Sequence, residues 1–113
     1  MLTKQELPEC PVATTVGLIG NKWKPLIIRN LLQGKQRYKY LQYGINGISA
    51  KVLTENLKQL ENDGIIKREV FADEIPLRVE YSLTELGEKI RPIITALADW
   101  GNLYKKEYQK QDN

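Results

Sequence analysis

The first half of the chain repeats its apolar residues with the period of a helix. Val12, Val16 and Ile19 follow one another at intervals of four and three residues, which places them on one helix face. Pro11 suits the first position of that helix. A denser apolar run over residues 26–32 predicts a second, buried helix, which a glycine then stops.

The middle of the chain predicts a short helix, a turn and a longer amphipathic helix. Residues 36–43 indicate a brief extended piece and then a helix from about Tyr38, and residues 44–47 indicate a turn. Ser49 is expected to cap a helix that runs to about Asn62. One side of this helix carries Val52, Leu53, Leu57 and Leu60, and the other carries Lys51, Thr54, Glu55, Lys58 and Asn62.

The last third predicts a β-hairpin followed by a long helix. Residues 65–71 and 78–83 are rich in β-branched and aromatic residues and are joined by a short loop. Thr84 is expected to cap the helix, and Pro92 to kink it. Apolar residues spaced alternately three and four apart form a heptad seam. The seam consists of Leu83, Leu86, Ile90, Ile93, Leu97, Trp100 and Tyr104.

This order of elements describes an α+β fold that is mainly α, a winged helix-turn-helix. Two helices joined by a short turn stand before a β-hairpin, which is the wing. We expect residues 1–113 to form one domain, with a DNA-binding core over about residues 22–83. Dimerisation helices are expected at about residues 10–20 and 84–108.

Positive charge is concentrated in the middle of the chain. The formal net charge is +3, yet residues 20–60 hold eight basic residues and a single acidic one, Glu55. Such a segment is typical of a surface that binds a polyanion, although a solvated lysine-rich face has the same composition.

The composition excludes several kinds of site. The chain has no histidine, which is the commonest general base and metal ligand. Its one cysteine, Cys10, cannot form an intrachain disulfide or a cysteine-rich zinc site. We therefore expect no metal, no cofactor and no enzyme activity, with carboxylates as the remaining acid–base groups. Without a signal segment or an apolar run near the ~20 residues of a membrane span, the protein is expected in the cytoplasm.

The helix predicted over residues 49–62 is the one that can enter a major groove. Its small first residues would let the backbone approach DNA, and its positive end would favour a phosphate. A solvated surface helix is the alternative. The residues expected to meet base edges or the groove are Ser49, Ala50, Lys51, Thr54, Glu55 and Lys58. The cations expected to meet phosphates, and so to set affinity and orientation, are Lys22, Lys24, Lys35, Arg37 and Lys39.

Arg78 has two possible roles at the edge of the predicted hairpin. It could reach a phosphate or the minor groove from the wing. It could equally pair with Asp73 or Glu74 in the adjoining loop.

The heptad seam needs an apolar partner. It could fold onto its own domain, but a chain of 113 residues has a limited core and the seam extends to Tyr104. We favour a homodimer, because two-fold dimers match palindromic operators. The residues expected at its interface are Leu86, Ile90, Ile93, Leu97, Trp100 and Tyr104.

Six pieces of the chain together carry a family resemblance. They are residues 10–12 (CPV), 19–28 (IGNKWKPLII), 37–38 (RY), 47–49 (GIS), 53–64 (LTENLKQLENDG) and 76–87 (PLRVEYSLTELG). In this order and spacing they resemble the HxlR family of bacterial transcription regulators, related to MarR-type winged helices, over about residues 10–104. The resemblance implies a DNA-binding regulator without enzyme activity that dimerises through its first and last helices.

The resemblance also implies a possible role for Cys10. In some members a cysteine at this position senses oxidants or electrophiles, often with a second cysteine. This chain has one, which leaves a bridge between the Cys10 residues of two copies, thiol capping or alkylation. A helix N-terminus favours a reactive thiolate, whereas Glu9 opposes it. A half-buried, inert cysteine is the alternative.

Two further functions stay open on the sequence alone. The apolar seam and the acidic C-terminal half would also suit a winged-helix protein-interaction module without specific DNA binding. An unidentified small-molecule effector could instead occupy a pocket between the helices of a dimer. The residues that would line that pocket are Trp23, Trp100, Tyr104 and Tyr108, although aromatic residues at helical spacing also suit a core or an interface.

Overall fold

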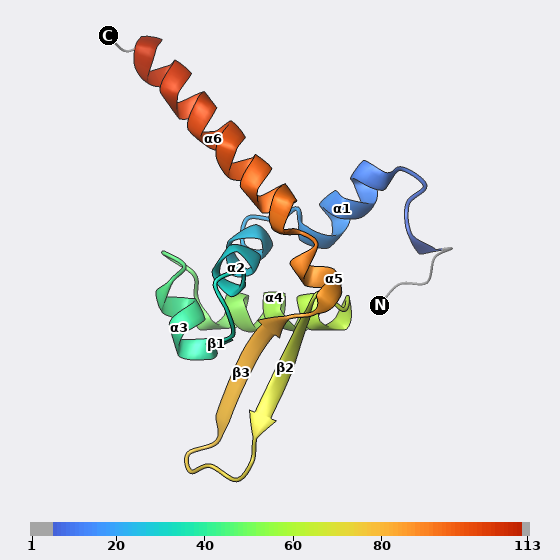
Figure 1. The fold of residues 1–113 in the computed structure, drawn as a ribbon, viewed down its shortest axis with the longest axis vertical. Coiled ribbons are helices and arrows are strands. Elements are labelled where there is room, and N and C mark those ends of the chain that lie inside the picture. Colours follow the sequence, from blue (N-terminus) through green and yellow to red (C-terminus); the bar gives the residue numbers. More distant parts are fainter. Residues whose placement is uncertain (1–5, 112–113) are drawn as a thin grey trace.

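A computed structural model describes residues 6–111, so the first five and last two residues of the predicted domain lie outside the described part (Figure 1). The fold is mainly helical with one small sheet, as predicted. The elements in chain order are α1 (Pro11–Ile19), α2 (Lys24–Leu31), β1 (Gln36–Arg37), α3 (Tyr38–Tyr43), α4 (Ala50–Asn62), β2 (Ile66–Phe71), β3 (Arg78–Leu83), α5 (Glu85–Glu88) and α6 (Arg91–Gln111).

Individual residues near the helix ends determine where the central helices begin and end. The Asn21 side-chain oxygen accepts hydrogen bonds from the backbone nitrogens of Trp23, the N-cap residue of α2, and of Lys24, at 3.0 and 2.7 Å, and so satisfies two donors at the start of α2. The Ser49 hydroxyl accepts from the nitrogen of Val52 at 3.2 Å and caps α4, as predicted. The end of α4 is a Schellman motif: Gly64 takes a positive φ of 77°, and the nitrogens of Gly64 and Ile65 donate to the carbonyls of Glu61 and Leu60, each at 3.0 Å.

The three strands form an antiparallel sheet in the order β1-β3-β2. The predicted hairpin is confirmed, and Ile66 lies opposite Leu83 at its base. β1 adds a two-residue edge, with Gln36 opposite Tyr81. Figure 1 shows the hairpin extending as a wing on the side of the molecule opposite α6.

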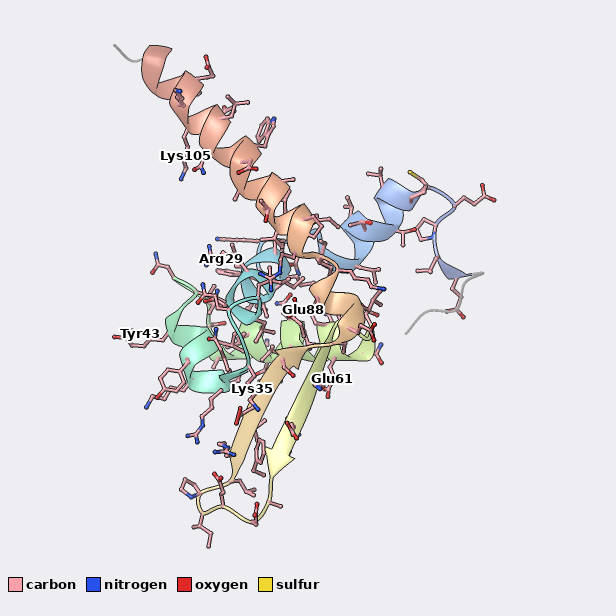
Figure 2. All side chains as sticks on the ribbon, viewed as in Figure 1. Arg29, Lys35, Tyr43, Glu61, Glu88 and Lys105 are labelled. Carbon is pink, nitrogen blue, oxygen red and sulfur yellow. The ribbon has the colours of Figure 1, made fainter. Side chains whose placement is uncertain are left out.

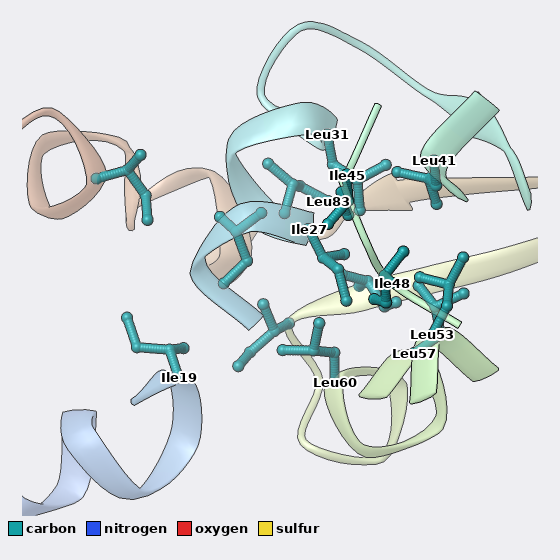
Figure 3. Close-up of a cluster of buried hydrophobic side chains, with 14 residues drawn as sticks. Ile19, Ile27, Leu31, Leu41, Ile45, Ile48, Leu53, Leu57, Leu60 and Leu83 are labelled. Atoms are coloured by element: carbon teal, nitrogen blue, oxygen red, sulfur yellow. The ribbon is translucent and has the colours of Figure 1, made fainter. Parts of the chain in front are cut away.

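The hydrophobic core is built from the middle of the chain. α2 contributes Ile27, Ile28 and Leu31, and α4 contributes the fully covered side chains of Leu53 and Leu60. Figure 3 shows these elements meeting around one cluster. α1 and α6 each add a single buried hydrophobic residue. Those two residues are Ile19 and Ile94.

The predicted C-terminal helix is two helices rather than one kinked helix. Thr84 caps the four-residue α5, and α6 starts afresh at Arg91. Pro92 has no backbone N–H, and within a continuous helix its ring would clash with the carbonyl of Glu88. In the second position of α6, where no such bond is required, the proline is tolerated. The heptad seam therefore does not lie on one helix.

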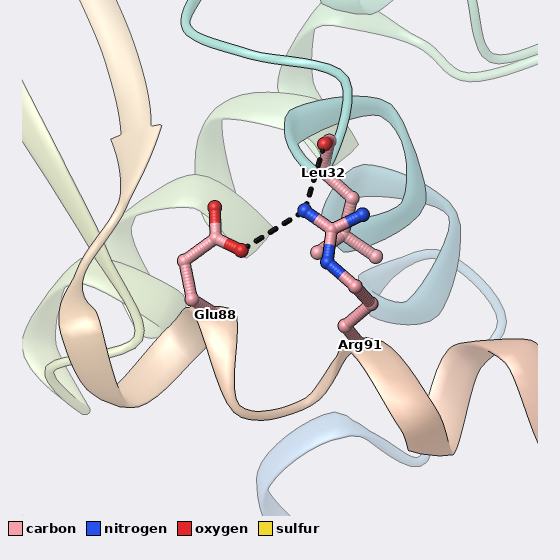
Figure 4. Close-up of polar contacts among 3 residues, drawn as sticks. All are labelled: Leu32, Glu88 and Arg91. Atoms are coloured by element: carbon pink, nitrogen blue, oxygen red, sulfur yellow. Dashed lines mark hydrogen bonds and ion pairs between the residues drawn. The ribbon is translucent and has the colours of Figure 1, made fainter.

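An arginine joins the break to the rest of the fold. The Arg91 guanidinium donates to the carbonyl oxygen of Leu32 at 3.1 Å and pairs with Glu88 at 3.0 Å (Figure 4). This contact ties the start of α6 to the C-terminal end of α2. Beyond it, α6 projects away from the body of the molecule (Figure 1).

Candidate nucleic-acid interface

α3, the turn after it and α4 form the helix-turn-helix. Leu53, Leu57 and Leu60 anchor the inner face of α4 in the core. The predicted groove residues on the outer face are all exposed, as the amphipathic pattern indicated. These are Ser49, Ala50, Lys51, Thr54, Glu55 and Lys58.

Tyr38 connects the two helices of the motif. Its hydroxyl lies 2.8 Å from the carbonyl oxygen of Ala50 and 3.1 Å from the hydroxyl of Thr54. Both partners belong to the first turns of α4. Sequence reasoning missed this contact. The signal that could have found it is a tyrosine at the start of α3, because a tyrosine ring packed on a core needs a partner for its hydroxyl.

Asn56 is a second residue that sequence reasoning missed. It is only 6% exposed, although it stands on a helix with a polar outer face. Its amide donates to the carbonyl of Val52 at 2.8 Å and its oxygen accepts from the side chain of Asn21 at 2.7 Å. Its position between Leu53 and Leu57 already indicates the buried face. The pair links the segment before α2 to α4.

Four of the five lysine and arginine side chains predicted to meet phosphates are exposed. They are Lys22, Lys35, Arg37 and Lys39. Lys24 departs from the expectation of an open phosphate contact, because its side chain is only 7% exposed. It stands three, four and seven residues before Ile27, Ile28 and Leu31, on the inner face of α2.

The wing holds Arg78 in place on its own strand. The guanidinium pairs with Glu74 at 3.1 Å and with Glu80 at 3.2 Å. It also lies 4.1 Å from the centre of the Phe71 ring. Of the two roles considered for Arg78, the structure shows the paired one. The charge still borders a surface hollow of about 460 Å³ beside Lys35 and Arg37.

A cation on β2 completes the surface beside α4, and sequence reasoning did not single it out. Arg68 is exposed and lies opposite Tyr81 across the hairpin. Together with Thr54 and Lys58 it borders a hollow of about 320 Å³ between α4 and the wing. The alternation of β2 places this side chain on the face toward α4.

Apolar side chains on α1 and α6 are left uncovered in the single chain. Val12 and Val16 on α1 are exposed, and an apolar groove of about 550 Å³ runs between α1 and the start of α6. Of the predicted interface residues, Ile90 is half-buried and the others are exposed, with Trp100 at 65%. The exposed ones are Leu86, Ile93, Leu97, Trp100 and Tyr104.

The aromatic residues considered for an effector pocket lie in two places. Trp100, Tyr104 and Tyr108 stack along α6, with successive ring centres 5.5 Å apart. Trp23 instead packs against the core, with the ammonium of Lys22 4.6 Å from its ring. One chain therefore does not assemble this pocket.

Cys10 stands at the N-cap of α1, directly before Pro11. It is exposed rather than half-buried. Its carbonyl accepts from the nitrogen of Thr14 at 3.0 Å, which fixes the backbone while leaving the thiol open to solvent.

Two further properties of residues 6–111 concern membranes and metal ions. Within this range no helix is long and apolar enough to cross a membrane. Over the same range no three histidine, cysteine, aspartate or glutamate side chains are grouped so as to hold a metal ion.

Comparison with known proteins gives related solved structures. The redox regulator HypR superposes in its reduced form with a TM-score of 0.82 at 36% identity, over 89% of this chain and 99% of that one. Its oxidised form gives 0.78 at 40% identity, over 82% and 95%. A MarR-family transcriptional regulator from Porphyromonas gingivalis W83 gives 0.78 at 42% identity, over 89% and 95%.

Sequence comparison gives the family. The chain is 43% identical over 101 residues to the uncharacterized HTH-type transcriptional regulator YdeP of Bacillus subtilis, covering 89% of this chain and 78% of that protein. The model of the HxlR-like helix-turn-helix family matches residues 18–109. The resemblance predicted from the sequence is confirmed: the chain belongs to the HxlR-like helix-turn-helix family and is a transcriptional regulator of the helix-turn-helix type.

Proposed function

We propose that the protein binds specific operator DNA as a homodimer, with α4 in the major groove. The observation that carries this proposal is the outer face of α4, where Lys51, Thr54 and Lys58 are exposed on a helix anchored from behind by core leucines. Side chains of these types form hydrogen bonds with base edges and phosphates. Relatives named as HTH-type transcriptional regulators support the same role.

The cations around α4 would bind the DNA backbone. Lys22, Lys35, Arg37 and Lys39 are exposed on the segments that flank the motif. Arg68 adds a positive charge on the wing beside α4. Such contacts set affinity and orientation without reading the sequence, and each neutralised phosphate makes binding more sensitive to salt.

The uncovered apolar faces of α1 and α6 support the homodimer. Val12, Val16 and Leu97 border one apolar groove, and the aromatic row of α6 continues beyond it. Burial of this apolar surface against a second copy would stabilise a dimer. A two-fold dimer would present its two α4 helices to half-sites about 34–36 Å apart on one face of the duplex.

A redox response at Cys10 is the regulation that one specific observation favours. The thiol is exposed at the start of α1, and the related regulator HypR has been solved in reduced and oxidised forms. α1 also contributes to the proposed dimer surface. A bridge between two copies, thiol capping or alkylation at Cys10 would therefore act where the two DNA-reading helices are positioned relative to each other.

A competition gel shift tests the proposal. Purified protein is titrated on the DNA upstream of its own gene, with scrambled duplex as competitor, and on sites selected from a random duplex library. We expect a shifted complex that survives the competitor. Lys51→Ala should weaken the specific site selectively, and Lys22→Ala should weaken all duplexes about equally. Failure to enrich any site, with affinity unaffected by salt, would refute DNA binding.

A further inference from the structure

The hydroxyl of Tyr38 forms hydrogen bonds with two groups of α4. One is the carbonyl oxygen of Ala50, 2.8 Å away, and the other is the hydroxyl of Thr54, 3.1 Å away. Tyr38 itself is half-buried with its ring against the core, whereas Thr54 is exposed. The Tyr38 hydroxyl therefore contacts the inner side of Thr54, whereas the outer side of Thr54 faces solvent.

Counting protons gives the direction of both hydrogen bonds. A carbonyl oxygen only accepts, so in the 2.8 Å contact Tyr38 must donate its single proton to Ala50. The 3.1 Å contact then needs a proton from Thr54, whose hydroxyl donates to the Tyr38 oxygen. Thr54 has only one hydroxyl proton, and this contact uses it.

The exposed side of Thr54 is left with lone pairs and a methyl group. In the major groove, a group that only accepts can pair with the amino groups of adenine or cytosine. It cannot donate to the oxygen or nitrogen acceptors of guanine or to the oxygen of thymine. An unconstrained threonine hydroxyl can rotate and serve either kind of base.

We infer that Tyr38 is a specificity-determining residue that acts through Thr54: by accepting the hydrogen bond of the threonine hydroxyl, it makes Thr54 select adenine or cytosine, the bases that present an amino group in the major groove. This inference rests on the proposed function, because it requires α4 to lie in the major groove. Tyr38 touches no base in this arrangement and is a positioning residue.

The test compares binding sites selected from a random duplex library by the full-length protein and its variants. Tyr38→Phe keeps the ring on the core and removes only the hydroxyl. We expect the wild type to prefer adenine or cytosine at one half-site position, and the variant to tolerate guanine or thymine there. Loss of one hydrogen-bond preference corresponds to about a three- to tenfold drop in discrimination. All other positions should keep their preferences.

Further variants separate this role from a structural one. Thr54→Val keeps the shape of the side chain without the hydroxyl, and it should abolish the preference at the same position. Tyr38→Phe should then have no additional effect in the Thr54→Val background. Tyr43→Phe is the matched control, because Tyr43 lies at the other end of α3 and is 91% exposed (Figure 2). It should leave the selected site unchanged.

The outcomes distinguish the inference from the function on which it rests. If the wild type selects a site and Tyr38→Phe selects the same one, the inference fails while DNA binding stands. Equal weakening at every position would likewise overturn it, since that is the effect of a purely structural residue. If the wild type enriches no site, the proposed function fails and the inference fails with it.

Discussion

Replacing Gly87 with alanine has two opposing effects on stability: a gain in helix propensity and a steric clash. Alanine favours a helix over glycine by about 1 kcal/mol, so the sequence alone predicts that Gly87→Ala stabilises the C-terminal region. The structure predicts the reverse. Gly87 is buried in α5, and a Cβ at this position would press against the carbonyl oxygen of Ile65.

The carbonyl of Ile65 has little freedom to move aside. It accepts from the backbone nitrogen of Thr84 at 3.0 Å and lies 3.1 Å from the Thr84 hydroxyl. That hydroxyl lies 2.7 Å from the carbonyl of Gly64 and accepts from the nitrogen of Gly87 at 3.0 Å. Overpacking of this kind costs about 1–3 kcal/mol, and each weakened hydrogen bond adds about 1 kcal/mol. The steric term exceeds the helix propensity, and we expect a net destabilisation of about 1–3 kcal/mol.

Urea unfolding measures whether Gly87→Ala raises or lowers the free energy of unfolding. The protein concentration must be held fixed, because a dimer unfolds at a concentration-dependent midpoint. Gly17→Ala is the matched control, since nothing lies within 4 Å of a Cβ added at this position of α1. It should stabilise the protein by up to about 1 kcal/mol. If Gly87→Ala proves as stable as the wild type, the close approach of α5 to Ile65 is refuted.

Three further perturbations test the linkage, the dimer and the thiol. Asn56→Ala should lower the unfolding free energy by about 1–3 kcal/mol, because a buried side chain and its two hydrogen bonds are lost; urea unfolding would contradict this if the variant matched the wild type. Leu97→Glu should shift the protein from dimer to monomer in sedimentation and weaken its binding to a two-fold operator. The control, Asn102→Glu, should change neither. A dimeric Leu97→Glu protein would argue against the proposed surface. Cys10→Ser should abolish any release from operator DNA by diamide, measured by gel shift, and undiminished release would remove the thiol from the mechanism.

Features that depend on neighbouring residues were predictable from the sequence. The cap of Ser49 acts within three residues, and the hairpin follows from two short runs of strand-forming residues. The outer face of α4 was predictable because its period is local. Arg78 was not, since either a phosphate or a nearby glutamate could take its charge. The predicted strand places Glu80 on the same face as Arg78, but it does not decide between these partners.

Lys24 was misjudged and Asn56 was missed for one physical reason. Each stands on the inner face of its helix, at the same spacing as the buried apolar residues around it. Residue type suggested an exposed side chain, while helical position indicated a buried one. Position prevails here because the Asn56 amide is satisfied by hydrogen bonds, which offset the loss of water. A polar residue that keeps the register of a buried stripe is therefore a candidate for an internal contact.

The heptad seam shows where apolar periodicity stops being informative. Regular spacing indicates a shared face only while the helix is continuous, and Pro92 ends that continuity at the junction of α5 and α6. Leu83 is buried in the core, Ile90 is half-buried at the break, and Leu97 is 52% exposed on the projecting helix. One stripe in the sequence thus serves two surfaces. The inner part stabilises the domain that carries α4, and the outer part is the surface that we propose a second copy covers.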